Sequence, residues 1–328
     1  MTPWQINKRL RIPWKPILAI SLSLCISLPP LEAEDIILES GFLSKNAEKF
    51  PWAVVFSQSA PIANPTGKIL VIYNHGSATD DNSEPYCNFL SRLYPLSALV
   101  GQSINNQEIL VYVVCTNTLS GDLNVKEGSD FPKEYLCGPS KQPGCSPKRY
   151  KEMKRREDIL KVIDSFIDQG FSKKQIYLAG HSCGGWQTLL LVGRHPDKIN
   201  GGIALDPGCY GSANWRRNKP NYTKLMKLEI AEISAFAELP VLVFTNKSSS
   251  CCGPTTLSWL AGKPLARLIE TPAKQKNRFI VGGQVCYFQN TRGTKTQPVT
   301  NGHQLNYSAC FMRYNSDILK FLSDRIHQ

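Results

Sequence analysis

Short apolar runs rich in Val, Ile and Leu constrain the fold of this chain most. They cover residues 68–73, 108–115, 175–179, 202–205 and 240–244. Near-continuous runs of this kind are typical of strands that are buried on both faces, which occur in parallel sheets covered by helices. The runs therefore predict a mostly parallel sheet with helices on both faces.

Helical patterns separate these runs. Residues 158–169 place four apolar side chains on one helical face, and residues 317–326 form a second amphipathic pattern. Alternating strands and helices imply right-handed crossovers and a single doubly wound α/β domain, here residues 34–328. Two segments, 117–150 and 210–239, interrupt the alternation. We expect both near the carboxyl ends of the strands, where such sheets bind ligands, and 210–239 is a candidate cap or pocket-shaping insertion.

The sharpest chemical signal is the sequence GHSCGG at residues 180–185, which matches the G-x-S-x-G pattern. An expected strand precedes it and a helical pattern follows it. In this context the serine lies on a tight strand-to-helix turn that exposes its hydroxyl, and glycines allow the backbone segments to approach closely. The pattern predicts that Ser182 is a nucleophile; the alternative is a Gly-rich turn with an ordinary hydroxyl.

With this elbow, the His75-Gly76 turn and the Leu205-Asp206-Pro207 turn, the chain resembles the α/β-hydrolase superfamily. It is most similar to dienelactone-hydrolase-like and platelet-activating-factor-acetylhydrolase-like esterases, over roughly residues 65–325. The resemblance implies ester hydrolysis without a cofactor.

An esterase of this type needs donors for the negative charge that develops on the substrate oxygen. The backbone N–H of Cys183, directly after the nucleophile, is one predicted donor. The second is expected in the turn after the first apolar run, from Ser77 or its neighbour Gly76, with His75 supporting the turn. A plain glycine turn is the alternative.

His303 is the predicted base. It follows the last expected strand and precedes the last helix, which is where the family places this residue, and a neutral histidine can accept and return a proton near neutral pH. We expect His181, inside the elbow, to point away from the substrate. A surface histidine is the alternative for His303.

Asp206 is the predicted third member of the triad. Many α/β-hydrolases place the acid after the strand that here ends at residue 244, but no carboxylate follows it, and Asn246 is uncharged. Asp206 ends the strand before, which resembles the acid position in the acetylhydrolases and in pancreatic-type lipases. The order Ser182, Asp206, His303 is that of the fold. A turn-capping aspartate is the alternative, with Asn246 orienting the histidine.

These residues predict a serine hydrolase that cleaves small-molecule or lipid-like carboxylic esters. A secreted lipase or polyesterase is the second hypothesis, for which Trp186, Trp215 and Trp259 would have to form an exposed platform rather than core. A non-catalytic binding protein on the same scaffold is the third. A peptidase of this fold usually carries a large extra domain, for which the chain has little room.

The first 33 residues have the pattern of a signal peptide. A basic segment precedes an apolar run at 17–28 that is shorter than the ~20 residues needed to span a bilayer. An uncleaved anchor is the alternative. We expect a secreted or periplasmic protein that begins near Glu34 and does not insert stably into a membrane.

The cysteines agree with export, because ten of the eleven follow this segment and disulfides persist in oxidising compartments. Cys137 and Cys145 are the expected local bridge. Cys251 and Cys252 are adjacent, so at least one is expected to pair elsewhere, and Cys183 is a candidate free buried thiol. The cysteine spacings match no zinc site, and no metal is expected.

The net charge of +12 is the last constraint. Residues 1–33 contribute four basic residues and one acidic residue, which leaves +9 on the remainder. The positive residues are scattered and carry no nucleic-acid-binding motif, so they predict a solvated basic surface and no nucleic-acid partner.

Overall fold

The computed structural model describes residues 40–46, 50–56, 61–76, 94–114, 147–211, 220–249, 251–289 and 296–328. All of them belong to one compact unit, Ile37–Gln328. The expected signal peptide, Ser77, Cys137, Cys145 and Trp215 lie outside the described residues, so the predictions for them remain predictions. Among the helices of the described part, none combines the length and the apolar character that a bilayer span requires.

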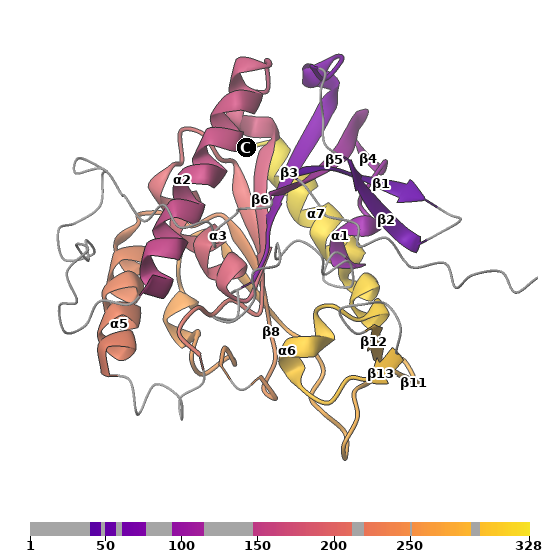
Figure 1. Cartoon of the computed structure of the whole chain (residues 1–328), viewed down its shortest axis with the longest axis vertical. Coiled ribbons are helices and arrows are strands. Elements are labelled where there is room, and N and C mark those ends of the chain that lie inside the picture. Colours follow the sequence, from indigo (N-terminus) through magenta and orange to yellow (C-terminus); the bar gives the residue numbers. More distant parts are fainter. Residues whose placement is uncertain are drawn as a thin grey trace, which may run out of the picture. The chain divides into compact units, whose positions relative to one another are not determined.

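A nine-stranded sheet runs through the described residues in the order β2-β1-β5-β3-β6-β7-β8-β9, with β4 paired to β5 (Figure 1). The strands from β5 to β9 along this order are parallel, and the amino-terminal hairpin β1–β2 and strand β4 are antiparallel. The five expected strands all form, which confirms the predicted mostly parallel sheet. The strands of this sheet are β1 (Gly41–Asn46), β2 (Phe50–Phe56), β3 (Lys68–Asn74), β4 (Ser103–Ile104), β5 (Gln107–Val114), β6 (Ile176–His181), β7 (Gly201–Leu205), β8 (Val241–Thr245) and β9 (Ala266–Glu270).

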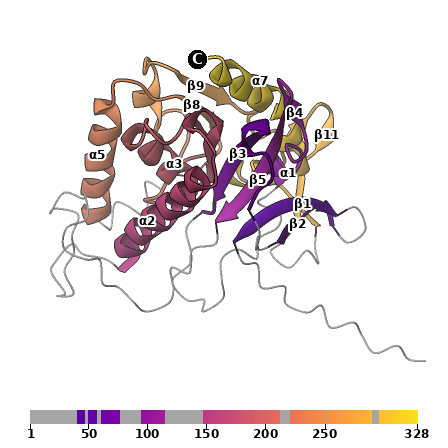
Figure 2. The ribbon, with the colours of Figure 1, turned by 90° about the horizontal axis from the view of Figure 1, so that it is seen from above.

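Helices cover both faces of the sheet, as predicted (Figure 2). Successive side chains of β3 alternate between two cores: Leu70 and Ile72 pack with α2, α3 and α5, whereas Ile69 and Val71 pack with α1 and α7. All four side chains are fully buried, which explains why the strand lacks a polar alternation. The helices are α1 (Tyr94–Ser97), α2 (Pro147–Asp168), α3 (Cys183–Arg194), α5 (Pro220–Ala235), α6 (Gly302–Leu305) and α7 (Asn315–Ile326), with 3-10 turns at Pro65–Gly67, Lys173–Gln175, Ser258–Leu260 and Ala309–Tyr314.

Two departures from the expected helices involve α2 and α5. Helix α2 begins at Pro147, well before the expected start at residue 158. Helix α5 lies within the segment 210–239 and packs on α3, where Arg194 pairs with Glu232 at 2.5 Å. This position is that of the crossover helix between β7 and β8. Residues 212–219 lie outside the described part, so a cap in this segment stays a prediction.

Between β9 and α6 the chain forms two small antiparallel hairpins that the sequence patterns did not predict. Strands β10 (Ile280–Val281) and β11 (Gln284–Val285) make the first, and β12 (Tyr287–Gln289) and β13 (Thr296–Pro298) make the second. A disulfide from Cys286 to Cys310 and a small apolar cluster around Phe279 hold this region together. The hairpins lead directly into α6, which carries His303.

The strand order reverses at β3, and this point defines the expected ligand site. Strand β3 pairs with β5 on one side and with β6 on the other, so the connection from β3 to β5 and the connection from β5 to β6 run in opposite directions along the sheet. In open α/β sheets, ligands bind outside the carboxyl ends of the strands at such a switch point. The turns after β3 and β6 contain Gly76 and Ser182.

Candidate active site

Ser182 lies on a tight turn between β6 and α3. Its φ of 57° is in the left-handed region, which is uncommon for a non-glycine residue. A Cβ atom on Gly180 would lie 2.4 Å from the carbonyl carbon of Gly184, and one on Gly184 would lie 2.3 Å from the carbonyl oxygen of Asn74. Only glycine permits both approaches, which brings the turn after β3 against the first turn of α3.

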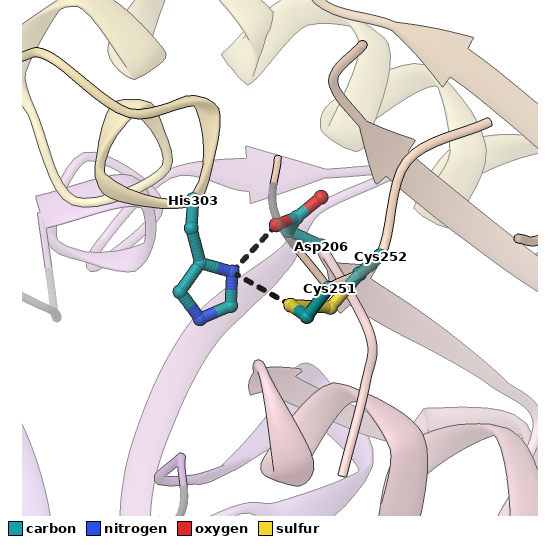
Figure 3. A group of neighbouring side chains, drawn as sticks. All are labelled: Asp206, Cys251, Cys252 and His303. Carbon is teal, nitrogen blue, oxygen red and sulfur yellow. Dashed lines mark hydrogen bonds and ion pairs between the residues drawn. A yellow bond between two sulfur atoms is a disulfide. The ribbon is translucent and has the colours of Figure 1, made fainter. Parts of the chain in front are cut away.

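Asp206 and His303, two members of the predicted triad, lie in contact with each other beside this turn. Asp206 follows β7, its side chain is fully buried, and its Oδ2 lies 2.5 Å from Nδ1 of His303 on α6 (Figure 3). His303 is only partly buried, with 20% of its side chain exposed. When Nδ1 carries the proton of the neutral ring and donates a hydrogen bond to the carboxylate, Nε2 is the proton acceptor of the ring.

The carboxylate of Asp206 is held by a residue that the sequence analysis did not identify. The Ser249 hydroxyl donates to Oδ2 of Asp206 at 2.6 Å, and the backbone N–H of Asp206 donates to the carbonyl of Phe244 at 2.7 Å. Ser249 lies in the serine-rich segment after β8, where the family more often places the acid. A hydroxyl from this loop therefore supports the carboxylate of the preceding strand.

Asn246, the alternative partner of the base, makes other contacts. Its amide donates to Oγ1 of Thr271 at 2.8 Å and to the carbonyl of Pro272 at 2.7 Å. Its Oδ1 accepts from the backbone N–H of Ser248 at 2.8 Å. The fully buried side chain thus fixes the loops after β8 and β9, and none of its hydrogen bonds within the described part of the chain goes to His303.

The hydroxyl of Ser182 donates to the carbonyl of Gly208 at 3.4 Å, and none of the hydrogen bonds among the described residues joins it to His303. Catalytic contacts are often long in the absence of substrate, so this geometry is compatible with a resting serine. His181 was expected to point away from the substrate. It is buried against His303, with ring centroids 4.4 Å apart, and its Nε2 donates to the His303 carbonyl at 3.2 Å.

A buried arginine fixes the turn after β3. Arg155 of α2 donates to the carbonyl of His75 at 2.9 Å and to that of Gly76 at 3.1 Å. The C=O and N–H of a trans peptide point in opposite directions, so the Gly76 N–H is turned away from Arg155. His75 also contacts the Gly76 carbonyl through Nδ1 at 2.8 Å, in agreement with its expected supporting role. The other expected donor of this turn, Ser77, is outside the described residues.

The disulfides correct two expectations. Cys183 is not a free thiol: it pairs with Cys209, because the Gly208 N–H donates to the Ser182 carbonyl at 3.0 Å and brings the two Cα atoms within 4.0 Å. Cys251 and Cys252 pair with each other rather than elsewhere. Both bridges lie in turns at the carboxyl ends of the strands. Cys183 is the first residue of α3, so its backbone N–H, the expected donor, lies at the amino end of this helix.

A buried ion pair contacts helix α3, which follows Ser182. The guanidinium of Arg156 on α2 contacts Glu229 on α5 at 2.6 Å, and Trp186 donates to the same carboxylate at 2.7 Å. Burial alone would raise the pKa of Glu229, but the Arg156 charge and hydrogen bonds from Tyr210, Arg156 and Trp186 outweigh it and lower the pKa below its usual value. Trp186 is thus part of the core and not of an exposed platform, and Trp259 packs against it.

The chain matches a family model and is similar to several solved structures. A family model described as alpha/beta hydrolase fold matches residues 136–245, which include the elbow, Asp206 and β8. No curated protein matches the chain. Similar solved structures include an S-formylglutathione hydrolase from Agrobacterium tumefaciens (14% identity, TM-score 0.43, covering 79% of this chain and 84% of that one). Est1E from Butyrivibrio proteoclasticus (14%, 0.44, 88% and 99%) and an acetyl xylan esterase from Paenibacillus sp. R4 (13%, 0.40, 68% and 73%) are also similar.

Proposed function

Because this chain has the α/β-hydrolase fold, we propose that it is a serine hydrolase that cleaves carboxylic esters through an acyl-enzyme. The observation that carries the proposal is the 2.5 Å contact between Asp206 and His303 beside the tight turn of Ser182. These three residues come from separate segments: the turn after β6, the turn after β7 and helix α6. A turn-capping aspartate and a surface histidine would have no reason to meet there.

The roles follow from the atoms that each residue presents. The Ser182 hydroxyl attacks the ester carbonyl, while Nε2 of His303 takes its proton and then gives it to the leaving alcohol. Asp206 holds the Nδ1–H tautomer and stabilises the imidazolium that forms during the reaction. In the second half of the reaction, water takes the place of the alcohol: His303 accepts a proton from the attacking water and then returns it to the Ser182 oxygen as the acid is released.

The developing oxyanion is stabilised by backbone donors on two segments. The N–H of Cys183 lies at the amino end of α3, where the helix dipole also favours negative charge. The turn held by Arg155 supplies the second donor, from Gly76 or Ser77. Its carbonyls bind Arg155, so the Gly76 N–H is directed away from the arginine and is available to a substrate.

Covalent labelling tests the nucleophile. A fluorophosphonate probe should label the purified protein, and Ser182→Ala should abolish the label because the probe reacts with an activated serine hydroxyl. Ser258→Ala is the matched control and should label normally, since Ser258 is an exposed residue whose hydroxyl donates to the Thr255 carbonyl. Equal labelling of the Ser182 variant would exclude this serine as nucleophile, and no labelling of the wild type would favour a non-catalytic binding protein.

We also propose that the protein is exported. The three disulfides among the described residues support this proposal, because such bonds persist in oxidising compartments.

A panel of p-nitrophenyl esters of increasing chain length separates an esterase for small substrates from a lipase. Activity that falls with chain length supports the first.

A further inference from the structure

Four groups that can ligate a metal meet at the base of the triad (Figure 3). They are the carboxylate of Asp206, the imidazole of His303 and the sulfurs of Cys251 and Cys252. One ligand atom from each lies within 4.8 Å of the other three. In the structure the two sulfurs are joined as a disulfide, whereas the species that ligates a metal is the thiolate.

We propose that reduction of the Cys251–Cys252 disulfide turns these four groups into a binding site for a soft divalent ion such as Zn²⁺. A small dithiol supplies two electrons and two protons, becomes a cyclic disulfide itself and leaves two cysteine thiols. The thiols release two protons as their sulfurs bind the ion. Two sulfur atoms, one imidazole nitrogen and one carboxylate oxygen form a set of four ligands of the types that Zn²⁺ prefers.

The surroundings favour a single ion at this position. Asp206 and Cys252 are buried, whereas Cys251 and His303 are partly exposed, so an ion enters from the side of the latter two residues. Sγ of Cys251 already lies 3.7 Å from Nδ1 of His303. A Cβ on Gly208 would lie 2.2 Å from Sγ of Cys252, so this sulfur is packed against the turn that accepts the Ser182 hydrogen bond.

Binding at this site would switch off the proposed base, and only this step rests on the proposed function. An ion on Nδ1 of His303 displaces the proton that this nitrogen shares with Asp206. The neutral ring then carries its proton on Nε2, which can no longer accept the proton of Ser182. The oxidised protein is the active form, and the reduced protein loses activity only when the ion is present.

Cobalt(II) is the probe for the site, because its bonds to thiolates absorb in the near ultraviolet. Reduced full-length protein, freed of excess dithiol, is titrated with Co²⁺ and should show this absorption at one ion per chain. Cys251→Ser/Cys252→Ser should lose it. His303→Gln should weaken Co²⁺ binding by more than about tenfold, since even residues that only support a ligand cost 10- to 100-fold in affinity. The control Cys286→Ala/Cys310→Ala removes a disulfide whose sulfurs are not among the four ligands and should bind as wild type.

Fluorophosphonate labelling of Ser182 is followed in the same samples. Zn²⁺ should block labelling of the reduced wild type, a chelator should restore it, and the oxidised protein should label with or without Zn²⁺. A thiolate absorption that persists in the Cys251→Ser/Cys252→Ser protein, or a Co²⁺ affinity unchanged by His303→Gln, overturns the site. If no form is labelled but the Co²⁺ results hold, the proposed function fails and the metal site stands. His303 is partly exposed, so we expect His303→Gln to fold. This variant therefore tests the site even if the double cysteine variant does not fold.

Discussion

The buried ion pair that contacts helix α3 gives a sharp prediction for stability. Glu229→Gln keeps the size of the side chain but removes the carboxylate charge that contacts the Arg156 guanidinium, and both side chains are only 3% exposed. Removing one partner of a buried pair costs about 3–5 kcal/mol. For a domain of this size, this corresponds to a fall in Tm of about 6–20 °C.

Thermal and urea unfolding at neutral pH measure the effect, and a second ion pair to α5 provides the control. Arg194 and Glu232 join α3 to α5, but their side chains are 15% and 25% exposed. Glu232→Gln should therefore cost only about 1 kcal/mol, since water screens the remaining charge. The reasoning fails if the Glu229 variant loses no more stability than the Glu232 variant.

The same pair predicts the pH dependence of stability. The folded protein lowers the pKa of Glu229, so the stabilisation is fully present above the unfolded pKa of about 4.3 and is lost as the pH falls through the folded value. The difference in unfolding free energy between wild type and Glu229→Gln should therefore shrink on acidification below that point. A difference that grows toward low pH would contradict the lowered pKa.

Three further predictions concern the proposed site and export. Asp206→Asn should reduce kcat for ester hydrolysis about ten-thousandfold with little change in Tm, whereas Asn246→Ala should leave the kcat of the folded protein unchanged. Activity that survives Asp206→Asn would reject Asp206 as the acid. Arg155→Met should lower kcat by up to about a hundredfold with KM nearly unchanged, because a misdirected oxyanion donor costs no more than a missing one; a change in KM alone would show a binding role instead. Intact mass of the exported protein should correspond to a start near Glu34 with Cys137 and Cys145 bridged, and a full-length chain with free thiols would contradict it.

The sequence by itself determined the strands, the elbow and the chain order of the candidate triad. Continuous apolar runs leave no polar face for solvent, so a parallel sheet covered on both sides was predictable without coordinates. The elbow was predictable because its glycines have a local cause: Gly180 and Gly184 lie where a Cβ would collide with nearby backbone. Periodicity and local backbone geometry depend on near neighbours in the chain.

The contacts that complete the site were decided by the tertiary structure. The pairing of Cys183 with Cys209 depends on two turns that lie side by side, although 26 residues separate the cysteines. The support of Asp206 by Ser249 depends on the loop of the next strand in the sheet. No spacing pattern in the sequence predicts either contact. Long crossovers join adjacent parallel strands, and the length of a crossover does not determine which loops meet at the carboxyl ends of the strands.

Asp206 and Asn246, the two candidate partners of His303, also show what the sequence determined and what the tertiary structure decided. Both Asp206 and Asn246 follow buried strands, and the sequence left Asn246 open as an alternative. The structure turns the amide of Asn246 toward Thr271 and Pro272 and brings only the carboxylate of Asp206 to His303. The direction in which a strand-end side chain points depends on which loop packs over it, and that loop is placed by the folded sheet as a whole.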